Sequence, residues 1–169
     1  MRLIFWLMFA VMTGVYLVMA LWSIPKVVAD AGGLLAFDLR PTGYSFDEAH
    51  AFLVALSDEG RAFYLNVQQM LDSAYPALFA VVMVMAFTYL FAGWPRWVAM
   101  ALALAGAGFD YMENAAVAVM LRAGDGLNAA MVATASQWTV LKSGAVTLAL
   151  LALTVGLVMS FMRRRKVQV

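Results

Sequence analysis

The stretch FDYMENAAVAV, residues 109–119, places three polar side chains inside an otherwise apolar run: Asp110, Glu113 and Asn114. Asp110 and Asn114 are four residues apart and Glu113 is three beyond Asp110, so on a helix all three share one face. A carboxylate that is held away from water takes up a proton readily and can serve as an acid or a base. Two carboxylates and an amide therefore predict a ligand site, a proton site or an acid–base catalyst.

Two more ionisable residues belong with this face. Asp72 lies in LDSAYP, residues 71–76, and Lys142 lies in TASQWTVLKSG, residues 134–144. A charge at the centre of a membrane helix costs about 2.5–3.5 kcal/mol on insertion scales, so such residues face protein or water and pair with one another. One lysine leaves two of three acids to be protonated, solvated or neutralised by a cation. With their aromatic neighbours, the candidate site residues are Asp72, Tyr75, Asp110, Glu113, Asn114, Trp138 and Lys142.

The same residues have a structural interpretation, because polar side chains also hold membrane helices together. Gly106 and Ala118 continue the face of Asp110 and Asn114 at intervals of four, and small residues allow a neighbouring helix to approach closely. The polar face is then the packing face and points into the bundle. Pro76 has no N–H, so the carbonyl of Asp72 loses its helical donor, which predicts a kink with unsatisfied backbone polarity.

The composition assigns the chain to the membrane class. Of its 169 residues 65% are hydrophobic and 12% charged, whereas soluble domains are about 45–50% apolar. A net charge of +1 argues against a nucleic-acid partner. The sequence has no cysteine and one histidine, His50, which excludes disulfides, iron–sulfur clusters, bis-histidine haem and all-histidine zinc sites. We expect no cofactor and no metal, since the carboxylate spacing matches no defined cation site.

A membrane span needs about 20 mainly apolar residues. Four segments qualify, at about residues 3–22, 72–94, 97–121 and 130–162. They predict an all-α, four-helix transmembrane bundle that forms a single domain over residues 1–169. The first segment is expected to remain as a helix instead of being cleaved as a signal peptide, because only Arg2 precedes it and its apolar run exceeds the usual 7–15 residues.

The loop between the first two spans, about residues 24–71, is patterned like a small helical cap. GG at 32–33 and PTG at 41–43 are turn signals. Ser45 stands three residues before Glu48, the spacing of a capping box, and Ser57 precedes a second helix start that runs on into the next span.

Basic residues set the expected orientation. Arg2, Arg96 and the RRRK tail at 163–166 gather on one side of the four spans, and such residues favour the cytoplasm. We therefore expect a bacterial inner-membrane protein with both termini inside and the helical loop outside.

The segments GYSFDEAHAFLVALSDEGRAFYL, LDSAYP, FDYMEN and TVLK together resemble a group of bacterial four-helix integral membrane proteins. The resemblance covers nearly the whole chain. It implies the four-helix architecture and no particular activity.

These observations predict a polar pocket that opens outward and binds a small or lipid-like ligand. Asp110 and Glu113 would form its charge centre, Lys142 the counter-ion and Asn114 an orienting amide, with Asp72 and Tyr75 at the mouth. Two other functions stay open: an intramembrane acid–base enzyme acting on a lipid or isoprenoid, and a structural or assembly subunit of a membrane complex. The expected partners are the lipid bilayer and either a lipid-like ligand or a membrane protein.

Overall fold

The computed structural model describes residues 2–167, and this part of the chain is helical with no strand. The prediction of an all-α fold is confirmed. The elements in chain order are α1 (Arg2–Val18), the π turn η1 (Met19–Ser23), α2 (Ile24–Asp30), the 3-10 turn η2 (Phe37–Leu39), α3 (Phe46–Ala55), α4 (Asp58–Phe63), the π turn η3 (Tyr64–Gln68), α5 (Gln69–Leu90), α6 (Trp94–Ala123), the 3-10 turn η4 (Gly124–Gly126) and α7 (Ala129–Val167).

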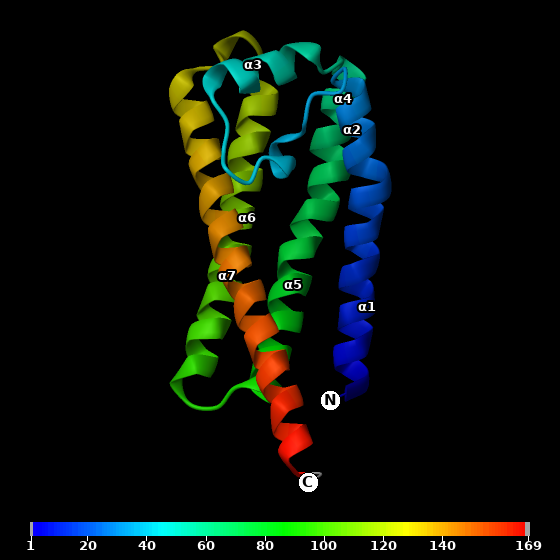
Figure 1. Cartoon of the computed structure of the whole chain (residues 1–169). Coiled ribbons are helices and arrows are strands. Elements are labelled where there is room, and N and C mark those ends of the chain that lie inside the picture. The colour runs from blue at the N-terminus through cyan, green and yellow to red at the C-terminus, as the bar shows by residue number, and fades with distance from the viewer. Residues whose placement is uncertain (1, 168–169) are drawn as a thin grey trace.

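Long rods dominate the arrangement. α1, η1 and α2 form one continuous helix, as do α4, η3 and α5. Figure 1 shows that α1 begins and α7 ends at the same end of the bundle, while α3 lies across the opposite end. We call residues 31–57, which contain η2 and α3, the cap.

Three helices are long and apolar enough to cross a membrane: Arg2–Asp30, Asp58–Leu90 and Ala129–Arg163. The segment expected as a further span, residues 97–121, lies in α6, which is 30 residues long. Within the described residues α6 does not meet the same standard of hydropathy. Asp110, Glu113 and Asn114 reduce its apolar character, so length and composition support three spans.

Helix boundaries follow local chemistry. α5 ends at Leu90, four residues before the predicted end of its span, and Trp94 instead opens α6. Gly93 makes the reversal with φ of 65°, a conformation that costs glycine little. Pro95 then occupies the first turn of α6, where its missing N–H does no harm.

The cap is built as its sequence predicts. The Ser45 hydroxyl accepts from the Glu48 amide, and the Glu48 carboxylate accepts from the Ser45 amide at 2.7 Å, so the capping box is confirmed. The hydrogen bond from the Ser45 amide, and then the one that the Ser45 hydroxyl donates at 2.8 Å, lower the pKa of the Glu48 carboxyl below its ordinary value. Arg61 of α4 fixes the cap further, because its guanidinium donates to the carbonyls of Leu121 at 2.7 Å and Leu53 at 3.0 Å.

Two apolar cores stack along the bundle. One joins the cap to the near ends of α6 and α7 and contains Phe52 and Val117. The other lies between α5, α6 and α7 nearer the termini and contains Phe87 and Ala103. Along α6 the residues between Ala103 and Val117 include all three polar residues of FDYMEN, so a polar layer separates the two cores.

The packing of α6 against α7 bears out the predicted small-residue face. A Cβ atom on Gly106 would stand 3.0 Å from Val146 Cγ2, tighter than ordinary contact. Gly106, Asp110, Asn114 and Ala118 are all buried. The polar face of α6 therefore points into the bundle, toward α5 and α7.

Candidate functional site

Lys142 of α7 is the centre of the polar layer. Its Nζ atom forms an ion pair with Glu113 and lies 3.5 Å from Asp110 Oδ1 and 3.8 Å from Asp38 Oδ1. Its side chain keeps 14% of its surface exposed. One ammonium group thus serves three carboxylates that come from two different parts of the chain, α6 and the cap.

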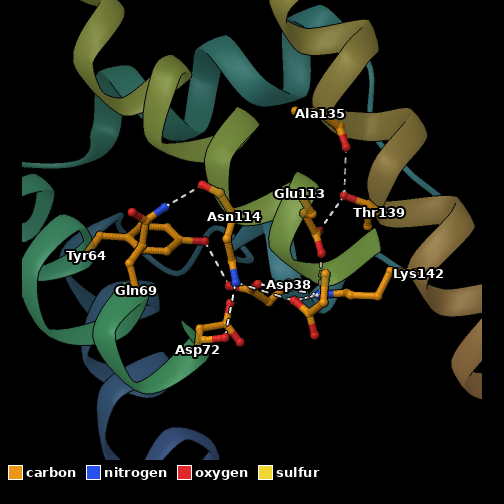
Figure 2. A network of polar contacts seen from close by, with 10 residues as sticks. Asp38, Tyr64, Gln69, Asp72, Glu113, Asn114, Ala135, Thr139 and Lys142 are labelled. Carbon is orange, nitrogen blue, oxygen red and sulfur yellow. Dashed lines mark hydrogen bonds and ion pairs between the residues drawn. The ribbon is translucent and has the colours of Figure 1, made fainter. Parts of the chain in front are cut away.

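Glu113 is the most enclosed of these acids, with no exposed surface. Besides Lys142, its carboxylate accepts a hydrogen bond from the hydroxyl of Thr139, which is one helical turn before Lys142 on α7. Thr139 is also fully buried and lies within hydrogen-bonding distance of the Ala135 carbonyl. Figure 2 shows Glu113 pointing toward α7, between Thr139 and Lys142.

Asp38 is the site residue that the sequence did not reveal. Asp38 lies in the turn η2 of the cap, next to Phe37, which is fully buried and packs its ring 4.9 Å from that of Phe52. The Tyr64 hydroxyl donates to Asp38 Oδ2 at 2.9 Å. The sequence feature that points to Asp38 is LLAFDL, in which a loop acid is flanked by apolar residues.

The cap contributes a second tyrosine near the cluster. Tyr44 is 8% exposed, and its amide donates to Ser136 Oγ of α7 at 2.8 Å. Burial raises the pKa of the Tyr44 hydroxyl well above its ordinary value, and the charges of Glu113 and Asp38 add to this effect. The hydroxyl therefore stays protonated at neutral pH.

Asn114 bridges α6 to α5 at the point where Pro76 interrupts the helical hydrogen bonds. Its Nδ2 atom donates to the carbonyl of Asp72 at 3.2 Å and lies 3.5 Å from Asp110 Oδ1. Gln69 donates in return to the Asn114 carbonyl at 2.8 Å. Because Pro76 cannot supply an N–H to that carbonyl, the Asn114 amide replaces the missing donor.

A cavity of about 620 Å³ opens beside this cluster. Four charged residues, Asp38, Asp72, Asp110 and Lys142, face it, and apolar residues make up most of the rest of its lining. The apolar walls come from α1, η1, α2, the cap and α7. The lining residues without a full charge are Tyr16, Met19, Ala20, Ile24, Pro25, Val28, Leu35, Leu39, Tyr75, Ser143 and Val146.

The predicted site residues divide into three groups. Asp72, Tyr75, Asp110 and Lys142 line the cavity. Glu113 and Asn114 lie behind it, in the hydrogen-bonded layer that holds Lys142 and Asp72 in place. Trp138 is not part of the lining; its ring packs 5.9 Å from that of Phe109 along the contact of α6 with α7.

The charge balance is more negative than the sequence suggested, because Asp38 joins the three expected acids. Three carboxylates lie within ion-pair distance of a single ammonium group, and a fourth, that of Asp72, lines the same cavity. Among residues 2–167, no three acids or histidines are arranged to hold a metal ion. An organic cation or protons would have to balance the excess charge.

Comparisons of the chain with protein families, curated proteins and solved structures found no match. The geometry of the site therefore carries the functional argument.

Proposed function

We propose that this chain is a four-helix inner-membrane protein that binds a small or lipid-like ligand in the cavity beside Lys142. The observation that carries the proposal is the character of the cavity wall: apolar over most of its area, with Asp38, Asp72, Asp110 and Lys142 gathered at one place. Binding sites for small organic ligands are commonly cavities of about 300–1,000 Å³ with apolar walls and a few placed polar groups. An amphiphile has this same division of apolar and polar parts.

Helix lengths support a membrane position that starts at the polar layer. At 1.5 Å per residue, the rise from Lys142 to Arg163 is about 31 Å, from Ser23 to Arg2 about 31 Å, and from Asp72 to Leu90 about 27 Å. These values match a hydrocarbon core of about 30 Å. The exposed side chains of this half of α7 support the same position, since from Leu148 to Met162 they are largely Leu, Val, Met and Phe.

In this arrangement the cluster lies at the outer edge of the hydrocarbon. α6 is shorter on this side, about 24 Å from Asp110 to Trp94, and Trp94 is 74% exposed. Tryptophan is frequent at membrane interfaces. The free-energy cost of burying these charges is smaller at the interface than at mid-membrane, because water and polar headgroups are near.

The basic residues indicate the orientation of the chain in the proposed membrane. Arg2, Arg96 and Arg163 mark the end of the bundle where α1 begins and α7 ends (Figure 1), which places both termini in the cytoplasm by the positive-inside rule. The cap and the cavity then face outward. The side chains of Arg164 and Lys166, part of the same basic tail, lie outside the described residues.

Native mass spectrometry of the full chain in mild detergent, with lipid extraction of the same sample, tests the proposal. A stoichiometric lipid or small molecule, lost in Asp110→Asn and retained in the exposed control Asp125→Asn, would support it. A folded monomer that carries nothing and takes up no added amphiphile would contradict it and would favour a purely structural polar network. A reproducible second polypeptide in the absence of ligand would instead indicate an assembly subunit.

The same variants separate binding from catalysis on a lipid. An acid–base enzyme should release altered ligand during incubation, and Glu113→Gln should stop this conversion while ligand stays bound. A binding protein should return the same molecule chemically unchanged.

A further inference from the structure

The carboxylate of Asp72 takes no part in the network of contacts around Lys142. Its side chain is buried, with 4% of the residue surface exposed, and it lines the cavity. No side chain or amide in the described part of the chain donates a hydrogen bond to its carboxylate, although Asn114 binds its backbone carbonyl. Lys142 lies within ion-pair distance of Asp38, Asp110 and Glu113 but not of Asp72.

A carboxylate that is exposed only toward a cavity and has no protein partner is costly, because it has lost most of its water and gained no donor in return. Its position in the cavity wall means that a ligand could supply the missing donors. A ligand that does so must carry positive charge or at least hydrogen-bond donors at the place where it meets Asp72.

Two aromatic rings beside Asp72 point to the same chemistry. Tyr75 follows Asp72 by three residues, and its ring centroid lies 6.0 Å from that of Tyr16 on α1, with the ring planes inclined by 37°. Both tyrosines line the cavity. Aromatic faces next to a carboxylate are how proteins recognise ammonium groups, because the ring quadrupole attracts the cation.

We propose that the cavity binds an amphiphile with a protonated amine as its head, the ammonium group lying against Asp72 and beside the rings of Tyr16 and Tyr75. This inference rests on the proposed function and names the class of its ligand. The apolar chain of the amphiphile lies along the walls formed by Met19, Ile24 and Val146.

Other head groups fit less well. An anionic head would need a free cation, but three carboxylates already surround Lys142. A neutral hydroxyl head could donate a hydrogen bond to the Asp72 carboxylate but would not balance its negative charge. A metal ion would need a group of ligands that residues 2–167 do not provide.

An ammonium amphiphile could be a free alkylamine or a membrane lipid with an amine in its head group. The shared chemistry is the ammonium group on an apolar chain. Phosphatidylethanolamine carries a phosphate beside the amine, so a site that takes dodecylamine but not phosphatidylethanolamine favours the free amine.

The test uses the full chain in a non-ionic detergent and measures binding by native mass spectrometry with titration. The probes are dodecylamine, dodecanol and dodecyl phosphate, which share one alkyl chain, together with phosphatidylethanolamine and phosphatidylglycerol. We expect dodecylamine to bind at least about ten-fold more tightly than dodecanol because of its charge-assisted hydrogen bonds. Asp72→Asn should abolish that preference, whereas the exposed control Asp125→Asn should keep it.

The outcomes separate this inference from the function on which it rests. Equal binding of dodecylamine and dodecanol, or preference for dodecyl phosphate, overturns the amine assignment but leaves an amphiphile-binding cavity. Binding of no probe overturns both. Should Asp72→Asn fail to fold, Tyr16→Leu provides the second test. This substitution removes one ring from the lipid-facing helix α1. It should weaken the binding of dodecylamine several-fold while leaving the binding of dodecanol unchanged. An equal loss of affinity for both probes overturns the ammonium site.

Discussion

Replacing Lys142 with methionine tests whether its ammonium group holds the polar layer together. The substitution keeps an unbranched side chain, one atom shorter, and removes the only cation within ion-pair distance of Glu113 in the described part of the chain. Glu113 has no exposed surface, so its charge is left in the protein interior. Removing one partner of a buried ion pair typically costs about 3–5 kcal/mol, and we expect a loss of free energy of unfolding of this size.

Glu113→Gln should cost less. Lys142 keeps Asp110 at 3.5 Å and Asp38 at 3.8 Å, and the glutamine oxygen can still accept from the Thr139 hydroxyl. The loss should be close to that of one hydrogen bond to a charged group, about 1.5–3 kcal/mol. In the double variant no charge remains at position 113 to be stranded, so it should be more stable than Lys142→Met alone, with a coupling of roughly 1–3 kcal/mol.

The free energy of unfolding can be measured by steric trapping or by denaturation in mixed micelles, with ligand binding followed in parallel. Arg122→Met is the matched control, since Arg122 is exposed at the end of α6 and its loss should change stability by less than about 0.5 kcal/mol. The reasoning is refuted if Lys142→Met is as mild as this control. It is also refuted if the double variant loses the sum of the two single losses.

Three further predictions follow from single contacts. Asn114→Leu should lower the free energy of unfolding by about 1–3 kcal/mol, because it leaves the Asp72 carbonyl without a donor. Pro76→Ala restores a backbone N–H, so the double variant should recover part of this loss. The same unfolding assay measures both. Gly106→Val should lower stability by about 1–3 kcal/mol because its side chain would meet Val146 at the contact of α6 with α7. The chain has no cysteine, so Val54→Cys in the cap should react with an impermeant maleimide in intact cells while Arg163→Cys should not; the reverse pattern would invert the proposed topology.

Features encoded by short-range spacing could be read from the sequence. The capping box of Ser45 and Glu48 depends on residues three apart, and the structure contains it. The shared face of Gly106, Asp110 and Asn114 depends on the helical repeat, and all three are buried. The effect of Pro76 on the carbonyl of Asp72 is also local, since it follows from the missing N–H.

Features that depend on how distant segments meet could not be read in this way. Asp38 lies in a loop with no helical period, and its approach to Lys142 depends on the anchoring of Phe37 in the cap core. Trp138 is four residues before Lys142 on α7, but its ring packs on Phe109 and does not line the cavity. In a helix that is apolar on all sides, hydrophobicity alone does not show which face meets the protein.

The depth of the α6 residues in the membrane also depends on how the helices meet. With residues 97–121 counted as one span, Asp110 falls near the middle of that span. In the structure, α6 contacts Asp72 of α5 through Asn114 and Lys142 of α7 through Asp110 and Glu113, and the proposed membrane begins at that level. Helix length alone could not locate the interface, since most of these helices exceed the bilayer thickness.

Lys142 pairs with several acids at once, but it does not pair with every acid of the site. Asp38 ties the cap to it, and Asp110 and Glu113 tie α6 to it. All three of these carboxylates lie within ion-pair distance of the ammonium group, and Asp72 does not. Asp72, fixed through its own backbone by Asn114, presents its carboxylate to the cavity as a fourth acid. A network meant only to set helix register would be expected to balance its charges within itself, whereas this one directs the excess toward a space large enough for a ligand.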